Sequence, residues 1–103
     1  MNFYLDSKKN NFKATLEVTK DGKYVLKKGS TVNRKISMSF KSYKTVLKRR
    51  DEYGLNEKNN VLNKDIKFNS SSVAGEFVTG SSCNGPSSWK NEKGMKLKEW
   101  LLK

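Results

Sequence analysis

The sequence predicts a single α+β domain in which an N-terminal antiparallel β-meander packs against two or three α-helices. The length of 103 residues suits one compact domain. Apolar and polar side chains alternate over residues 12–18, as in a strand with one solvated face. From residue 39 onward, apolar side chains recur at helical spacing instead. We therefore expect residues 1–38 to form the meander with its connection, and residues 39–103 to form the helical part.

The strands of the meander follow from this alternation. A short first strand is expected around Phe3 and Leu5, and a second at residues 12–18. The dipeptide Asp21-Gly22 predicts a type I′ hairpin turn, because both positions tolerate positive φ, and a return strand follows at residues 24–26. The inward face of the second strand is expected to consist of Phe12, Ala14, Leu16 and Val18.

A first helix is predicted from an N-cap at Ser39 to about Tyr53, with Gly54 as its left-handed terminator. On a helical wheel, its apolar arc contains Phe40, Tyr43, Val46 and Leu47. The neighbouring arc is a basic stripe of Lys41, Lys44 and Lys48, which Arg49 and Arg50 extend.

The rest of the chain predicts an extended piece at residues 65–68 and two further helices. Ser70 suits the N-cap of a helix of about nine residues that ends at Gly80. Its buried face is expected to contain Val73, Ala74, Phe77 and Val78. A turn-rich run over residues 81–88 precedes a terminal helix at residues 95–103, whose apolar face is expected to contain Leu97, Trp100 and Leu101.

Composition excludes several kinds of site. The chain has no histidine, which excludes Ser-His-Asp and Cys-His nucleophiles and His-ligated zinc. Cys83 stands alone, so neither an intrachain disulfide nor a four-cysteine zinc site can form. The acidic residues are scattered along the chain, which argues against a pair of catalytic carboxylates. We expect a monomeric, cytoplasmic protein that is not an enzyme and has no cofactor, metal or membrane partner.

A series of short motifs in the second half resembles a known family. The pattern D-x-x-F-x-S-P-S-x-A-A…G…N-G…W-K…G-x-x-L matches, in order, residues 65–68, 70–74, Gly80, Asn84-Gly85, Trp89-Lys90, Gly94 and Leu97. The chain thus resembles the domain of unknown function 4357 family. That resemblance implies an accessory role, because such domains often accompany GIY-YIG nucleases or restriction-modification proteins. Ser71 replaces the pattern's proline and Gly75 one of its alanines, which predicts a weaker helix.

The charge balance indicates a polyanionic partner. The chain carries 22 Lys and Arg against 10 Asp and Glu, a net charge of +12. The basic stripe with Arg49 is one candidate phosphate-binding surface, and its alternative is an ordinary solvated helix face. A docking surface requires these cations to gather on one side of the fold.

A second candidate contact is the segment from Asn84-Gly85 to Trp89-Lys90 and Lys93. The indole of Trp89 could stack on a base while Lys90 meets a phosphate. The alternatives are a structural Asn-Gly turn and a Trp89 side chain that fills the core.

Together these observations predict a non-catalytic nucleic-acid-binding accessory domain that binds DNA, rather than RNA, through its phosphates. The expected partner protein is a linked or separate nuclease or methyltransferase domain. The alternative is a protein-docking module, whose signature is an exposed apolar patch. Leu97, Trp100 and Leu101 are the candidate residues for that patch.

Overall fold

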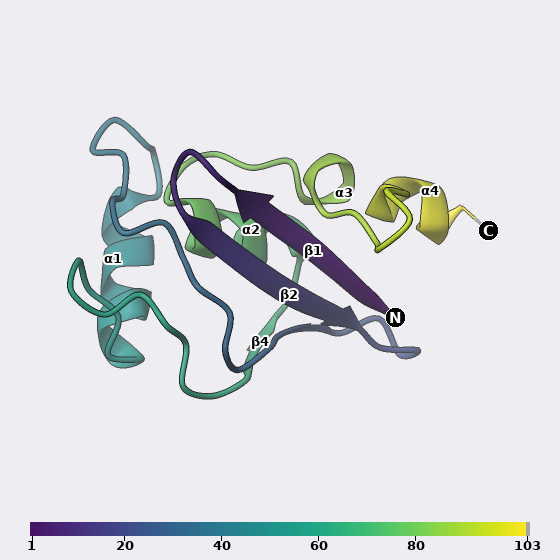
Figure 1. Ribbon diagram of the computed structural model, residues 1–103, viewed down its shortest axis with the longest axis horizontal. Helices are drawn as coiled ribbons and strands as arrows, with labels where there is room; N and C mark the ends of the chain where they lie inside the picture. The colour runs from purple at the N-terminus through teal and green to yellow at the C-terminus, as the bar shows by residue number, and fades with distance from the viewer. Residues whose placement is uncertain (103) are drawn as a thin grey trace.

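The computed structural model describes residues 1–102 and has an antiparallel sheet with strand order β1-β2-β3-β4, in front of helix α2 (Figure 1). The predicted α+β class and N-terminal meander are confirmed. The elements are β1 (Asn2–Ser7), β2 (Phe12–Val18), β3 (Tyr24–Leu26), α1 (Tyr43–Glu52), β4 (Ile66–Phe68), α2 (Ser71–Thr79), α3 (Gly85–Ser88) and α4 (Leu97–Leu101).

Side-chain alternation places one face of the sheet in the core. The register pairs Phe3 with Leu16, Leu16 with Leu26, and Leu26 with Ile66. These four side chains therefore form one buried row across the sheet. The predicted inward face of β2 is confirmed, since Phe12, Ala14, Leu16 and Val18 are all buried.

The turn between β2 and β3 differs from the predicted type I′ turn. Gly22 has a φ of 80°, but Asp21 keeps a negative φ. The Gly22 N–H donates to the Thr19 carbonyl at 3.1 Å, and the Thr19 N–H donates to the Lys23 carbonyl at 3.0 Å. The Thr19 hydroxyl also donates to the Asp21 carboxylate, which holds Asp21 in this conformation. Only the glycine therefore takes the left-handed conformation.

Helix α2 matches its predicted length and both predicted caps. The Ser70 hydroxyl accepts from the Val73 N–H at 3.0 Å, and Gly80 ends the helix with a φ of 71°. Ala74, Phe77 and Val78 are buried as predicted, but Val73 is exposed. Ser71 and Gly75 are buried in its place, because the row that faces the sheet begins at Ser71 and continues at helical spacing.

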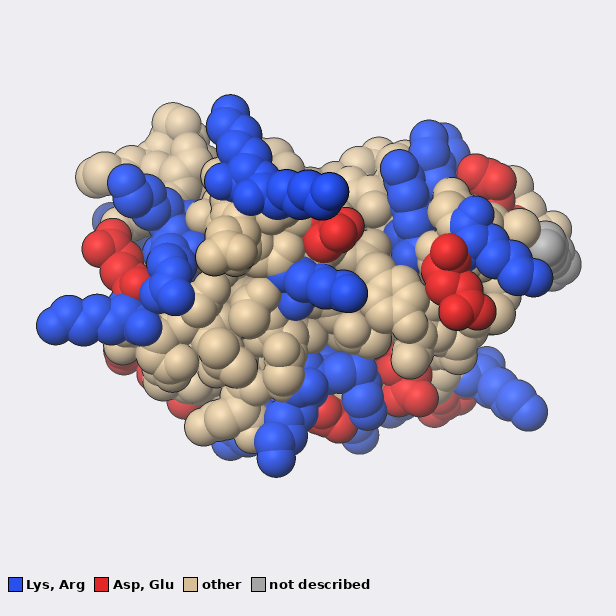
Figure 2. Space-filling view, viewed as in Figure 1, with Lys and Arg blue, Asp and Glu red and all other residues tan. Residues whose placement is uncertain are grey.

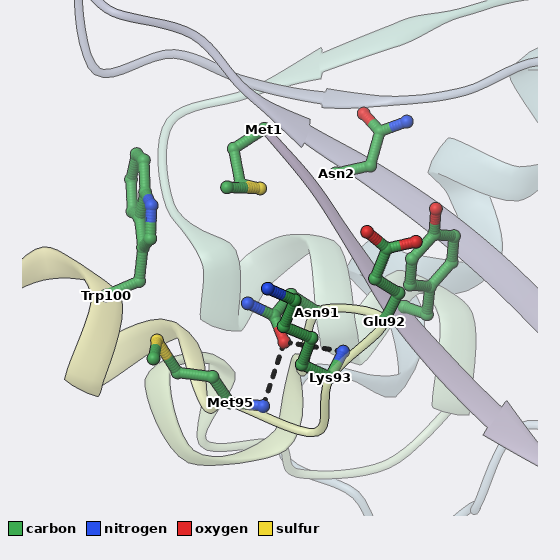
Figure 3. Close-up of a pocket in the computed structure, with 8 residues that line it drawn as sticks. Met1, Asn2, Asn91, Glu92, Lys93, Met95 and Trp100 are labelled. Atoms are coloured by element: carbon green, nitrogen blue, oxygen red, sulfur yellow. Dashed lines mark hydrogen bonds between the residues drawn. The ribbon is translucent and has the colours of Figure 1, made fainter.

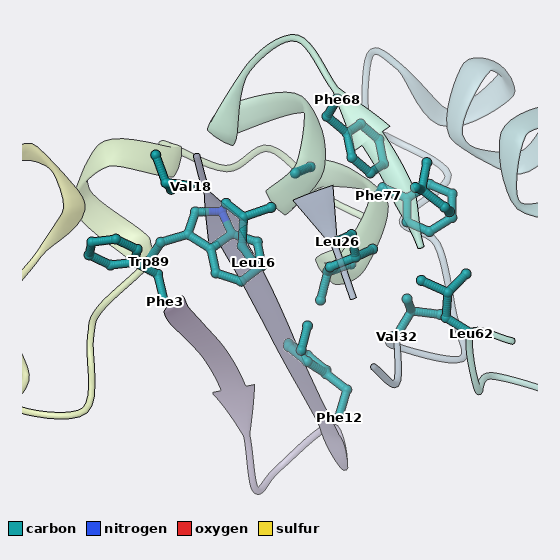
Figure 4. Packing of buried hydrophobic residues seen from close by; sticks show 14 of the residues in the cluster. Phe3, Phe12, Leu16, Val18, Leu26, Val32, Leu62, Phe68, Phe77 and Trp89 are labelled. Carbon is teal, nitrogen blue, oxygen red and sulfur yellow. The ribbon is translucent and has the colours of Figure 1, made fainter. Parts of the chain in front are cut away.

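The core beneath the sheet is rich in aromatic rings. Trp89 lies among Phe3, Leu16 and Val18 (Figure 4) and is fully buried. The rings of Phe68 and Phe77 meet at a centroid distance of 5.4 Å. These contacts attach α2 and the segment that contains Trp89 to the inner face of the sheet.

Helix α1 begins three residues later than predicted, with its N-cap at Ser42 instead of Ser39. The Phe40 N–H donates to Ser37 and the Tyr43 N–H donates to Phe40, so a turn precedes the helix. The Ser39 hydroxyl pairs with the Ser37 hydroxyl, and Ser42 is the N-cap residue instead. Leu47, predicted to be buried, is exposed.

The C-terminal part contains two short helices. The turn-rich run of residues 81–88 includes α3. Helix α4 starts at Leu97, two residues later than predicted, and its predicted end at residue 103 lies outside the described residues. None of the helices within residues 1–102 has the length and apolar character needed to cross a bilayer.

Candidate nucleic-acid interface

The predicted basic stripe is exposed, but only part of it belongs to a helix. Lys44 and Lys48 lie on the surface of α1, while Lys41 lies in the turn before it. The Arg49 guanidinium sits 4.3 Å above the Phe68 ring. The stripe therefore offers ammonium groups to solvent, whereas the adjacent guanidinium is held against the fold.

Arg50 does not extend this surface as predicted, because it is buried. Its Nε and Nη2 donate to the Phe77 carbonyl at 3.0 and 2.7 Å, and its Nη1 donates to the Asn33 carbonyl at 2.6 Å. Burial lowers the pKa of Arg50 to about 10. This cation stabilises the contact between α1 and α2 and is not available to a ligand.

The predicted base-stacking role of Trp89 is wrong. Its side chain has 0% exposure, and its indole N–H donates to the Ser71 carbonyl at 3.0 Å. The alternative reading, a tryptophan that fills the core, describes the structure.

Asn84 and Gly85 also have structural positions. The Asn84 side chain accepts from the Ser87 N–H at 3.2 Å and caps α3. Gly85 is buried so closely against α2 that an added Cβ would lie 2.3 Å from the Ser71 carbonyl carbon. The main-chain groups of Gly85 are paired with Ser72 and Trp89, contrary to the nucleotide-binding role predicted for this residue, whereas Asn84 is exposed.

Lys90 and Lys93 are exposed on a segment that attaches to the free edge of β1. The Tyr4 N–H donates to the Lys90 carbonyl at 2.7 Å, and the Lys90 N–H donates back to Tyr4 at 3.1 Å. The Leu97 N–H donates to the Trp89 carbonyl at 2.9 Å, which closes the segment into a loop. Because Trp89 and Leu97 are both buried, the two ends of this loop are firmly anchored.

This loop and β1 enclose a hollow of about 690 Å³. We call it the β1-edge hollow (Figure 3); it is lined by Met1, Asn2, Tyr4, Asn91, Glu92, Lys93, Met95 and Trp100. An adjoining hollow of about 490 Å³ shares Tyr4, Asn91 and Glu92 and includes Lys90. The surface aromatic rings near the predicted lysines are therefore Tyr4 and Trp100.

Asn91 organises the floor of the β1-edge hollow. Its side-chain Oδ1 accepts from the Lys93 N–H at 3.0 Å and from the Met95 N–H at 2.9 Å, as the dashed lines in Figure 3 show. Gly94, with a φ of 83°, allows the tight turn that brings these donors together. The carbamoyl plane of Asn91 is thereby fixed.

The predicted site residues do not form one site. Helix α1 and helix α4 lie at opposite ends of the long axis, which extends 38 Å (Figure 1). On the face seen in Figure 2, basic side chains occur at both ends, along the edges and near the middle, with acidic side chains between them. This face has no continuous cationic patch.

One family model matches the chain: the domain of unknown function DUF4357, over residues 3–101. The chain belongs to the DUF4357 family. No curated protein and no solved structure matches it. The loop that closes the β1-edge hollow contains four residues of the family pattern, namely Trp89, Lys90, Gly94 and Leu97.

Sequence reasoning did not place two aromatic residues, Tyr4 and Trp100, at the β1-edge hollow of this DUF4357 domain. Tyr4 lies between Phe3 and Leu5, so the alternation of β1 already placed it on the outer face of the sheet. Trp100 was assigned to the apolar face of the terminal helix, yet it is only half-buried. The attachment of residues 90–96 to β1 is a long-range contact, and no local pattern indicated it.

Proposed function

We propose that this DUF4357 domain is a non-catalytic, cytoplasmic nucleic-acid-binding module that holds DNA phosphates for a DNA-processing or restriction-modification enzyme. One observation carries the proposal. Within residues 1–102, only Lys27 forms ion pairs, with Glu17 at 3.7 Å and Asp65 at 3.1 Å. The other surface lysines have no carboxylate partner within 4 Å in this part of the chain, so their charge is available to a polyanion.

The arginines favour phosphate contacts over base-specific ones. Arg50 is buried, Arg49 lies on Phe68, and Arg34 donates through Nη1 to the Glu57 carbonyl at 2.7 Å. Reading a guanine in the major groove takes a free guanidinium fork, whereas an ammonium group is a point charge. Binding by the lysines is therefore independent of base sequence.

Fluorescence anisotropy with a labelled duplex and a labelled single strand tests the proposal. We expect the logarithm of the affinity to fall with the logarithm of salt concentration with a slope of about −4, as for ~4–5 neutralised phosphates. Absence of binding to both probes at low salt would overturn the proposal.

Charge-reversal variants locate the contact. Lys44→Glu/Lys48→Glu and Lys90→Glu/Lys93→Glu probe the two ends of the molecule. Lys8→Glu/Lys9→Glu, in the loop between β1 and β2, is the control with the same change in net charge. If the control weakens binding as much as both test variants, net charge alone drives binding and the predicted lysines are not the site.

A docking module remains the second candidate, and an apolar hollow beside α1 supports it. This hollow of about 540 Å³ is lined in part by Met38, Leu47 and Leu55, and the Met38 side chain is 83% exposed. The patch expected at the C-terminal end is smaller, because Leu97 is buried. The absence of nucleic-acid binding at low salt would favour the docking module over the nucleic-acid-binding module.

A further inference from the structure

We infer that the β1-edge hollow receives one unpaired nucleobase, stacked on Trp100, so that the domain prefers single-stranded nucleic acid. This inference rests on the proposed nucleic-acid-binding function and identifies the form of its ligand. Four observations support it: a fixed aromatic surface, unpartnered polar groups, lining side chains of balanced charge and exposed lysines on the adjoining segment.

The aromatic surface is provided by Trp100. The ring of Trp100 meets that of Phe3 at a centroid distance of 5.5 Å and an interplanar angle of 69°, which fixes the plane of the indole. The side chain is half-buried and forms one wall of the hollow (Figure 3). A planar base can stack on such a ring with little loss of side-chain freedom.

Several polar groups around the hollow have no protein partner. Asn91 uses only Oδ1 in its hydrogen bonds, so its NH2 group is held in position with both donors free. Among residues 1–102, the Trp100 indole N–H, the Tyr4 hydroxyl and the side-chain amide of Asn2 also make no hydrogen bond to the protein. No buried side-chain polar atom in that part of the chain is unsatisfied, so these groups are open to solvent. They can donate to and accept from the edge of a base.

The charges of the hollow favour a neutral ligand inside it. Lys93 and Glu92 are the two charged side chains that line it, and their charges cancel, while the Met1 α-ammonium donates to the Val18 carbonyl at 3.3 Å. A phosphate inside would meet the Glu92 carboxylate, whereas a base could donate a ring or exocyclic N–H group to it. The exposed Lys90 and Lys98 and the partly exposed Lys96 belong to the same part of the chain and can neutralise the adjoining phosphates.

A paired and stacked base cannot enter such a hollow without leaving the duplex. A single strand offers its bases at no such cost, so the affinity for single strands should exceed that for duplex at the same salt concentration. The planar base is the feature common to DNA and RNA, and the probes below separate the two.

Tryptophan fluorescence tests the inference directly, because Trp89 is fully buried and Trp100 lines the hollow. The probes are oligo(dT), oligo(rU) and a duplex, each of about 12 nucleotides or base pairs. We expect the single strands to quench the emission, with midpoints equal to those from anisotropy, and the duplex to quench less. Stronger binding of oligo(dT) supports DNA as the ligand, and stronger binding of oligo(rU) identifies RNA.

Variants separate stacking from charge. Trp100→Ala should weaken single-strand binding by about 10-fold or more, the loss of one stacked base. Asn91→Asp keeps the acceptor for the Lys93 and Met95 N–H groups but removes the free donors, and should weaken binding more than Asn10→Asp, an exposed control with the same change in charge. Leu101→Ala, at a half-exposed position of the same helix, is the control that should leave binding unchanged.

The outcomes distinguish this inference from the proposed function. If single strands bind without quenching, and Trp100→Ala and Asn91→Asp bind them as tightly as the unmodified chain does, the inference is overturned while phosphate binding stands. Equal affinity for duplex and single strand also overturns it. Absence of binding to every probe at low salt overturns the proposed function itself.

Discussion

The guanidinium of Arg50 donates two hydrogen bonds to the main-chain carbonyl of Phe77, through Nε at 3.0 Å and Nη2 at 2.7 Å. Phe77 lies in the last turn of α2, where carbonyls have no partner within the helix. Nη2 also reaches the Val78 carbonyl at 3.2 Å, so a side chain from α1 caps the C-terminus of α2. The cation also meets the negative end of the helix dipole.

Removal of this cap should destabilise the fold. Arg50→Met keeps much of the side-chain volume but leaves buried carbonyls without donors, so we expect a loss of about 2–4 kcal/mol in the free energy of unfolding. Urea denaturation followed by circular dichroism measures it. Arg49→Met, at a partly exposed position, is the control and should cost less than about 1 kcal/mol. An Arg50→Met protein as stable as the control would show that water satisfies these carbonyls.

Ser71→Pro should stabilise α2. Ser71 is the first residue of the helix, its N–H donates no hydrogen bond within residues 1–102, and Ser70 has the extended conformation that a following proline requires. We expect a gain of about 0.4–1 kcal/mol, chiefly from the lower entropy of the unfolded chain. Thermal denaturation measures it.

Ser72→Pro is the matched control for that change. The Ser72 hydroxyl accepts from the Gly85 N–H at 2.9 Å, and this bond joins α2 to α3. Proline at position 72 removes the hydroxyl, so this variant should be less stable than the unmodified chain. A loss of stability in Ser71→Pro as well would indicate that the ring collides with its surroundings.

Gly75 makes room for the side chain of Cys83. A Cβ added at position 75 would lie 2.4 Å from the Cys83 Sγ, so Gly75→Ala should cost about 1–3 kcal/mol despite the better helix propensity of alanine. Cys83→Ala removes the sulfur and should recover most of this loss. A double-mutant cycle by urea denaturation measures the coupling, and additive effects would contradict it.

The Asp65 carboxylate should make stability depend on pH in the acid range. It accepts from the Lys28 N–H at 2.7 Å and the Lys27 Nζ at 3.1 Å, and these bonds lower the pKa of Asp65. A lowered pKa means that the folded state binds this proton less readily than the unfolded state does. The stabilisation is therefore present at pH values above the ordinary aspartate pKa of 3.8, and it is lost as the pH falls through the pKa of Asp65 in the folded state.

Comparison with Asp65→Asn tests this pH dependence. The difference in stability between Asp65→Asn and the unmodified chain should be largest near neutral pH and shrink below the ordinary aspartate pKa. Urea denaturation at several pH values measures it. A difference that does not change with pH would exclude the carboxylate as its source.

The elements that depend on local sequence could be predicted. The alternation over β2 identified its inward face because the opposite face of the sheet is solvated, and the Ser70 and Gly80 caps gave the ends of α2. A cap and a turn act within a few residues, so the sequence contains their full signal.

The candidate site could not be predicted in the same way. Arg50 is buried because the end of α2, 27 residues later in the chain, supplies carbonyls for it. A tryptophan suits either the core or a binding surface, and the choice between Trp89 and Trp100 depends on how residues 90–96 attach to β1. These are tertiary contacts, and they decide which chemical groups remain free.

The pairing of Tyr4 with Lys90 has a consequence for behaviour at high concentration. The segment that contains Lys90 occupies the middle of the outer edge of β1. At the opposite edge of the sheet, β4 has only three residues, and Arg49 Nη2 donates to the Lys67 carbonyl at 3.4 Å. A strand from a second molecule would have to displace one of these groups before it could extend the sheet. The fold therefore protects itself against edge-to-edge aggregation and fibril growth.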